Sequence, residues 1–139
     1  VMRLMSLRIL IIEDNEQNRY LLTFLLEQRG HTVQSAIDGG TGIRKAQQWQ
    51  PDLILLDIQL PTMHGYDVAA ELRRHQSTAS IPIVAVTSYA MPGDRERAIE
   101  SGCDGYVEKP IDPDTFVAQV EAYCTSAESG GRCGPGSGS

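Results

Sequence analysis

The feature that most constrains the fold is the run Leu53-Ile54-Leu55-Leu56, which is followed at once by Asp57. Four consecutive apolar residues are typical of a strand that is buried on both faces, and such strands belong inside parallel sheets. In open α/β sheets, ligands bind in the crevice beyond the carboxyl ends of the strands. A carboxylate at that end of a buried strand makes Asp57 the first candidate functional residue.

The rest of the chain divides into alternating strand and helix segments. Apolar or alternating patterns predict further strands at residues 8–13, 32–36, 81–87 and 105–108. Helical spacing, caps and prolines predict helices at 17–29, between a glycine-rich loop at 39–42 and Pro51, from Gly65, from Pro92 to Ile99, and after Asp112. The chain therefore contains five strand-helix units.

The apolar character of the strands predicts their order in the sheet. The first, third and fourth strands are apolar throughout, whereas the second and fifth are short or mixed and suit the two edges. Right-handed crossovers then place helices on both faces. We predict an α/β fold with a doubly wound, five-stranded parallel sheet in the flavodoxin-like order 2-1-3-4-5.

Length and composition limit the possible classes of function. The 139 residues suit one folded domain, expected at 8–125, with an extension at 1–7 and a Gly/Ser-rich tail at 126–139 that is disordered or a vector remnant. A net charge of -6 argues against direct nucleic-acid binding, and no apolar run approaches the roughly 20 residues that cross a bilayer, so no membrane association is expected. Three cysteines without metal-ligand spacing favour a reduced, cytoplasmic protein.

Polar side chains stand at the predicted carboxyl ends of four strands. Glu13 and Asp14 follow the first strand, Asp57 ends the third, Thr87 ends the fourth, and Lys109 follows the fifth. Because three gathered carboxylates repel one another, they require a cation or a raised pKa, and hard oxygen ligands suit Mg²⁺. A hydroxyl and an ammonium nearby suit an incoming phosphoryl group.

Each of these residues also has an ordinary explanation when taken alone. Glu13 and Asp14 could form a solvated turn, Thr87 could be a strand-end hydroxyl, and Lys109 could be a surface charge. Surface solvation does not readily explain five polar groups at one edge of four strands, so we favour a joint functional role.

Four short motifs carry a resemblance to a known family. They are Ile-Ile-Glu-Asp-Asn at 11–15, Leu-Leu-Asp-Ile-Gln-Leu-Pro at 55–61, Val-Thr-Ser at 86–88 and Tyr-Val-Glu-Lys-Pro at 106–110. In identity, order and spacing they resemble the receiver domain of two-component response regulators, and the likeness runs from about residue 8 to residue 123. The chain resembles the single-domain chemotaxis regulators among them.

The resemblance implies a role for each residue of the acidic cluster. Asp57 would be the phosphoacceptor, and Mg²⁺ would be bound by Asp14, Asp57 and the backbone carbonyl of Gln59, with Glu13 acting through water. Mn²⁺ could substitute. Glu13 replaces the commoner aspartate. The Lys109–Pro110 peptide bond would be cis.

The resemblance also implies a switch. Lys109 would pair with the phosphoryl oxygens, and Thr87 would move to hydrogen-bond them, which lets Tyr106 turn inward. Ser88 stands where the family keeps a small residue that leaves the phosphoryl group room. We hypothesise that bulky Tyr89 shields the acyl phosphate from water; a solvent-facing tyrosine is the alternative.

The implied partners are a histidine kinase or a histidine phosphotransfer protein and a downstream protein target. The phosphodonor would dock on a surface formed by Asn15, Asn18, Leu22, Pro110 and Ile111. The alternative is core packing for Leu22 and plain solvation for the others. The output face would be the helix predicted at 92–99, the strand at 105–108 and the helix after Asp112, which could also form a homodimer. The protein would be a switch rather than an enzyme, catalysing only its own phosphorylation and slow autodephosphorylation.

Two other functions are open. A haloacid-dehalogenase-like phosphatase also forms an aspartyl phosphate, but it needs an acid/base aspartate where this chain has Gln59, and its acidic pair follows the nucleophile. A non-phosphorylated interaction module usually lacks one of the key groups.

We expect residues 39–42 to form a turn, and His31, His64 and His75 to lie at the surface or in loops.

Overall fold

The structure is a computed structural model that describes residues 6–60, 62–88 and 92–125. The predicted tail at 126–139 and Tyr89 lie outside the described residues, as does most of the predicted extension at 1–7.

Five parallel strands form one sheet in the order β2-β1-β3-β4-β5, which confirms the predicted topology. The strands are β1 (Arg8–Ile12), β2 (Thr32–Ala36), β3 (Leu53–Asp57), β4 (Ile83–Thr87) and β5 (Gly105–Glu108). The central strand β3 is buried along its whole length. Ile12 pairs with Leu56 and Asp57 pairs with Val86, so the three central strands end at one edge of the sheet.

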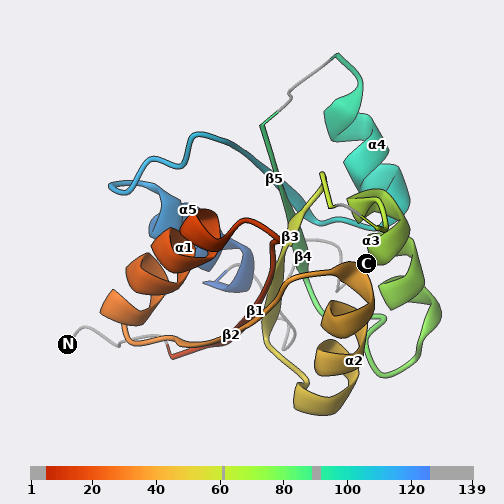
Figure 1. The fold of residues 1–139 in the computed structure, drawn as a ribbon, viewed down its shortest axis with the longest axis horizontal. Coiled ribbons are helices and arrows are strands. Elements are labelled where there is room, and N and C mark those ends of the chain that lie inside the picture. The colour runs from red at the N-terminus through yellow and green to blue at the C-terminus, as the bar shows by residue number, and fades with distance from the viewer. Residues whose placement is uncertain (1–5, 61, 89–91, 126–139) are drawn as a thin grey trace.

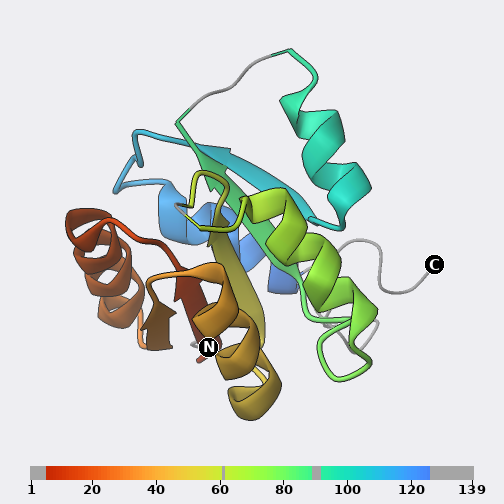
Figure 2. The same ribbon diagram turned by 45° about the vertical axis from the view of Figure 1, so that its right-hand side comes forward.

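Helices cover both faces of the sheet. They are α1 (Glu16–Gln28), α2 (Gly39–Trp49), α3 (Gly65–Arg74), α4 (Asp94–Ser101) and α5 (Phe116–Thr125). Figure 1 shows α1 and α5 together on one face, and α2, α3 and α4 on the other; the turned view of Figure 2 shows the same layers. Within the described ranges, no helix has the length and apolar character that crossing a membrane would need.

The strand side chains alternate between two apolar clusters. Leu10, Ile54 and Leu56 point into the cluster beneath α2, α3 and α4. Ile11 and Leu55 point into the cluster beneath α1 and α5. Because each fully buried side chain of this size stabilises the fold by about 1.5–3 kcal/mol, the two clusters fix the orientation of the strands.

The glycine-rich segment 39–42 is the first turn of α2, so the prediction of a loop is wrong. Asp38 caps this helix, and its carboxylate accepts a hydrogen bond of 2.8 Å from the Thr41 N–H. A Cβ on Gly42 would lie 2.5 Å from Ile12 Cδ1, and one on Gly39 would lie 2.7 Å from a Val68 methyl. These glycines therefore allow close packing rather than a turn.

Two helices begin later than predicted. α4 starts at Asp94 after Gly93, which has φ 91°, so Pro92 precedes the helix. Asp112 caps a separate turn ahead of α5: its side chain accepts the Asp114 N–H at 2.9 Å, and its carbonyl accepts the Phe116 N–H at 2.9 Å.

His31 lies in the loop between α1 and β2, which agrees with one of the two predicted positions, but it is buried rather than at the surface. Its Nδ1 accepts a hydrogen bond of 3.1 Å from the Leu7 N–H, so its Nε2 carries the hydrogen that is shared with Glu121 Oε2 at 2.7 Å. The other carboxylate oxygen of Glu121 pairs with Arg29 at 2.8 Å. We call these residues the Glu121 cluster; it joins α5 to the amino-terminal edge of the sheet.

A second ion pair lies at the same edge of the sheet, between Arg73 and Asp104. Arg73 Nη2 lies 2.8 Å from Asp104 Oδ2, and its Nε and Nη1 donate to the carbonyls of Gly102 and Ile81 at 2.9 and 2.7 Å. Asp104 Oδ2 also accepts the Ile83 N–H at 2.9 Å. One side chain of α3 thus holds the start of β4 and the loop before β5.

Candidate functional site

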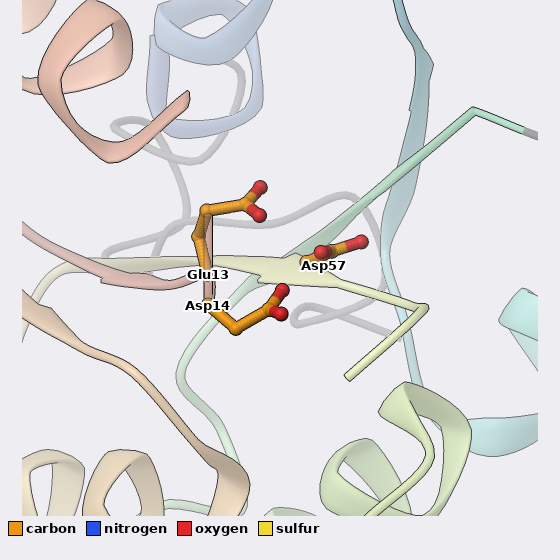
Figure 3. Close-up of side chains that lie close together, drawn as sticks. All are labelled: Glu13, Asp14 and Asp57. Atoms are coloured by element: carbon orange, nitrogen blue, oxygen red, sulfur yellow. The ribbon is translucent and has the colours of Figure 1, made fainter. Parts of the chain in front are cut away.

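The sheet register brings three carboxylates together at the carboxyl edge. Ile12 pairs with Leu56, so Glu13, the next residue after β1, lies beside Asp57 at the end of β3. Each of Glu13, Asp14 and Asp57 offers an oxygen, and these oxygens lie within 4.8 Å of one another. Figure 3 shows the Asp14 side chain directed toward Asp57, with Glu13 at the same end of β1. The expected convergence of these acids is therefore present.

Lys109 forms ion pairs with two of these carboxylates. Its Nζ lies 3.0 Å from Glu13 Oε1 and 3.7 Å from Asp57 Oδ2. Its backbone N–H donates to the Thr87 carbonyl at 2.8 Å, which keeps the residue beside the end of β4. The second oxygen of Glu13 accepts the Asn15 N–H at 3.2 Å. Glu13 is therefore held at both oxygens, and it is the nearer of the two acids to Lys109.

The electrostatics of the cluster are unbalanced. Asp57 is 4% exposed and Glu13 is 1% exposed. Burial, and then the charge of Glu13, raise the pKa of Asp57 from 3.8 to about 7, against the smaller opposing effects of the Gln59 N–H and Lys109. Two like charges about 4 Å apart repel by about 4 kcal/mol at an effective dielectric near 20. Three acids that share one ammonium therefore leave an excess of negative charge.

The donor set of this cluster fits a hard divalent cation. All three side chains offer carboxylate oxygens, the ligands that Mg²⁺ prefers, and Asp14 is exposed, so the site opens to solvent. Gln59 lies at the same place, since its N–H donates to Asp57 Oδ1 at 3.1 Å. A dication would neutralise the charge that raises the pKa of Asp57.

The remaining predicted residues lie on β4 and β5 and in the segments that follow these strands. Thr87 is buried at the end of β4, and Ser88 is exposed directly after it. The Lys109–Pro110 peptide bond is cis, as the resemblance implies. Tyr106 packs against the core cluster beneath α4, and its buried hydroxyl has no hydrogen-bond partner among the residues described. Arg95 lies 5.7 Å from the centre of the Tyr106 ring.

Leu22 does not belong to a docking surface, so that prediction is wrong. Its side chain is 2% exposed and packs in the core beneath α1 and α5. Asn15 is exposed as the cap of α1, and its side chain accepts the Asn18 N–H at 2.9 Å. The exposed apolar residues of α1 are instead Tyr20 and Phe24, whose rings stack with centroids 6.3 Å apart.

Sequence reasoning missed Arg19. Its Nη1 donates to the backbone carbonyls of Glu13 and Asp14, at 3.0 Å each. The sequence carries no signal for this contact, because an arginine on the polar side of a helix is ordinary; only the geometry assigns it to the acidic cluster.

Comparison with known proteins identifies the family. Residues 9–121 match the response regulator receiver domain. The chain belongs to this family. Receivers are signalling switches of two-component systems rather than classical enzymes, and the matched segment spans the sheet from β1 to β5 and all three carboxylates.

Curated relatives include single-domain regulators. The chain is 37% identical over 123 residues to the polar-differentiation response regulator DivK of Brucella ovis, covering 88% of this chain and 100% of that protein. It is 38% identical over 119 residues to DivK of Brucella anthropi, with 86% and 97% covered.

Solved receiver structures share the fold. A CheY-like receiver protein from Methanospirillum hungatei matches with a TM-score of 0.82 and 27% identity, over 89% of this chain and 98% of that one. The receiver domain of a sensor histidine kinase from Pseudomonas aeruginosa, which has a magnesium ion coordinated in its active-site cleft, matches with a TM-score of 0.77 and 30% identity, over 85% and 97%. These findings do not favour the phosphatase or the unphosphorylated module.

Proposed function

We propose that Asp57 is the phosphoacceptor of this receiver. A carboxylate oxygen of Asp57 attacks the phosphorus of a phosphohistidine; the P–N bond breaks, the imidazole leaves with the electron pair, and an acyl phosphate forms. The observation that carries the proposal is the position of Asp57, a buried carboxyl at the carboxyl edge with Lys109 Nζ 3.7 Å away and two further acids beside it.

Glu13, Asp14, Asp57 and the backbone carbonyl of Gln59 would hold Mg²⁺, with Glu13 acting through water. Mn²⁺ would substitute, because it also accepts oxygen ligands. The bound cation supplies charge neutralisation and keeps Asp57 ionised as a nucleophile. The oxygen-only donor set and the raised pKa of Asp57 support this assignment.

Lys109 and Thr87 bind the phosphoryl oxygens in this proposal. The Lys109 ammonium exchanges its ion pair with Glu13 for the new phosphoryl group, and the Thr87 hydroxyl donates to another oxygen. Movement of Thr87 lets Tyr106 turn further inward. The small, exposed Ser88 leaves room for the phosphoryl group, and Tyr89 slows its hydrolysis by excluding water. Loss of the group by autodephosphorylation is slow.

The phosphodonor is a histidine kinase or a histidine phosphotransfer protein. It docks over Asn15, Asn18, Pro110 and Ile111, which lie around the same edge as Asp57.

A reducing, cytoplasmic location belongs to this proposal, and the free thiols of Cys103 and Cys124 support it.

The output surface is the face formed by α4, β5 and α5. A groove of about 480 Å³ lies there, and its lining includes Arg95, Glu96, Tyr106, Glu108 and Gln119. Because Tyr106 contributes to both the groove and the core, its rotation would change the shape of this face. A downstream protein, or a second copy of the chain, would bind here.

Incubation with Mg²⁺ and acetyl phosphate, followed by intact mass measurement and site mapping, tests the proposal. The wild type should gain one phosphoryl group on Asp57, and chelation of the metal should prevent the gain. Asp67→Asn, which changes an exposed acid of α3, is the matched control and should react like the wild type. If Asp57→Asn gained the group as readily, the proposal would be wrong.

A further inference from the structure

Arg19 reaches back from α1 to the loop that carries the acidic pair. Its Nη1 donates to the carbonyl oxygens of both Glu13 and Asp14, at 3.0 Å each. Arg19 also begins the helix, since its backbone N–H donates to the Asn15 carbonyl at 2.9 Å. One residue therefore ties the start of α1 to the two peptide groups at the edge of the cluster.

Those two carbonyls lie where the chain leaves the sheet. The Glu13 N–H makes the last contact with β2, to the Ala36 carbonyl at 3.0 Å, and α1 starts only at Glu16. Between these points the backbone must turn so that Glu13 points into the buried cluster while Asp14 stays exposed. In the described part of the chain, Arg19 provides the donor for both carbonyls.

The place of Arg19 in α1 is unfavourable for a cation as far as the helix itself is concerned, although the nearby carboxylates attract it. The amino end of a helix carries partial positive charge, so acidic residues are preferred there and basic residues are disfavoured. Holding a long side chain in one conformation also costs entropy. A residue that breaks local preferences in this way needs a gain elsewhere. The two carbonyl contacts and the attraction of the carboxylates provide that gain, and of these only the carbonyl contacts fix the backbone.

We propose that Arg19 is a positioning residue for the divalent cation site, and that it acts by fixing the backbone from which Glu13 and Asp14 project. It does not touch the cation or the phosphoryl group. The inference rests on the proposed function, because it assumes that the three carboxylates bind Mg²⁺. Groups that hold metal ligands in place typically change metal affinity about 10- to 100-fold when removed.

Charge and positioning predict opposite results when Arg19 is replaced. A guanidinium close to the site repels a dication, so removal of its charge alone would tighten Mg²⁺ binding a few-fold. Loss of positioning would instead weaken binding, because the loop carboxylates would no longer be held together. The sign of the change in affinity therefore separates the two effects.

The test is titration of the full chain with MgCl₂ by calorimetry, in the wild type, Arg19→Met, Arg19→Lys and Arg44→Met. Arg44 is an exposed arginine of α2, so its variant matches the charge change away from the loop. We expect Arg19→Met to bind Mg²⁺ about 10-fold more weakly, and Arg19→Lys to recover part of the loss. Arg44→Met should stay within about 2-fold of the wild type.

Thermal unfolding without metal shows whether each variant is folded. If Arg19→Met does not fold, the comparison of Arg19→Lys with the wild type decides. Unchanged or tighter Mg²⁺ binding in a folded Arg19 variant would overturn the positioning role and leave the proposed function standing. A wild type that binds no Mg²⁺ at millimolar concentration would overturn both.

Discussion

Two buried clusters of charged side chains lie at opposite edges of the sheet, and they differ in balance. In the Glu121 cluster, one carboxylate accepts from a neutral His31 and from Arg29, and the second nitrogen of His31 is used by the Leu7 N–H. At the carboxyl edge, three carboxylates lie together and Lys109 pairs with two of them, Glu13 and Asp57. A network whose groups are all paired is expected to have a structural role, whereas an excess of negative charge is what the proposed cation would neutralise.

The largest expected effect is on the balanced cluster. Glu121→Ala should lower the free energy of unfolding by about 2–3 kcal/mol, mainly because it leaves the buried N–H of His31 without its acceptor. The loss of the Arg29 pair adds little, because that side chain is 53% exposed. Urea unfolding measures this. Glu27→Ala, which removes an exposed acid of α1, should change stability by less than about 0.5 kcal/mol. Equal losses of unfolding free energy in the two variants would mean that the contacts of Glu121 do not stabilise the fold.

The unbalanced cluster should respond in the opposite direction. Folding raises the pKa of Asp57 from 3.8 to about 7, so between about pH 4 and pH 7 the folded protein binds a proton that the unfolded chain has lost. The stability contributed by this group therefore falls as pH rises through that range. Asp57→Asn removes the ionised form, so at pH 8 it should raise the free energy of unfolding by about 2 kcal/mol.

Urea unfolding of Asp57→Asn and of the wild type at pH 4 and pH 8, without divalent metal, checks this sign. The gain should be present at pH 8 and nearly absent at pH 4. Asp67→Asn serves as the exposed control at both pH values. An Asp57→Asn protein that is less stable than the wild type at pH 8 would show that the carboxyl edge is not strained by charge.

The smallest effect concerns the hydroxyl of Tyr106, which is buried with no partner within the described segments. Tyr106→Phe removes a polar group that folding has desolvated without compensation, so it should be neutral or should stabilise the protein by up to about 1 kcal/mol. Thermal unfolding measures the change. A loss of more than 1 kcal/mol would mean that the hydroxyl has a hydrogen-bond partner in solution. Tyr106 would then belong to a paired polar group, like the Glu121 cluster.

Most of the sheet could be predicted because its strands carry strong local patterns. The apolar run that ends at Asp57 identified the central strand, and the order of the strands followed from which runs were apolar throughout. Parallel pairing then brought Glu13 beside Asp57 without any knowledge of side-chain contacts.

The failures have a common cause, which is that contacts between distant residues override local preference. The glycines at 39 and 42 predict a turn, but Val68 leaves no room for a side chain at Gly39, and Ile12 leaves none at Gly42. The burial of His31 within its loop could not be predicted, because its partner Glu121 lies 90 positions away. Leu22 is an exception, because its burial follows the apolar spacing of α1 and only the resemblance implied a docking role. The contacts of Arg19, in contrast, are visible only in the packed structure.

The pair formed by Arg73 and Asp104 has a consequence for building hybrid receivers. A crossover placed anywhere between α3 and β5 would take the guanidinium from one parent and the carboxylate from the other. The Asp104 carboxylate also accepts the Ile83 N–H, so a mismatch would disturb the start of β4 as well. When output faces are exchanged between receivers, the crossover should therefore lie ahead of α3. Otherwise both residues of the pair should be taken from the same parent.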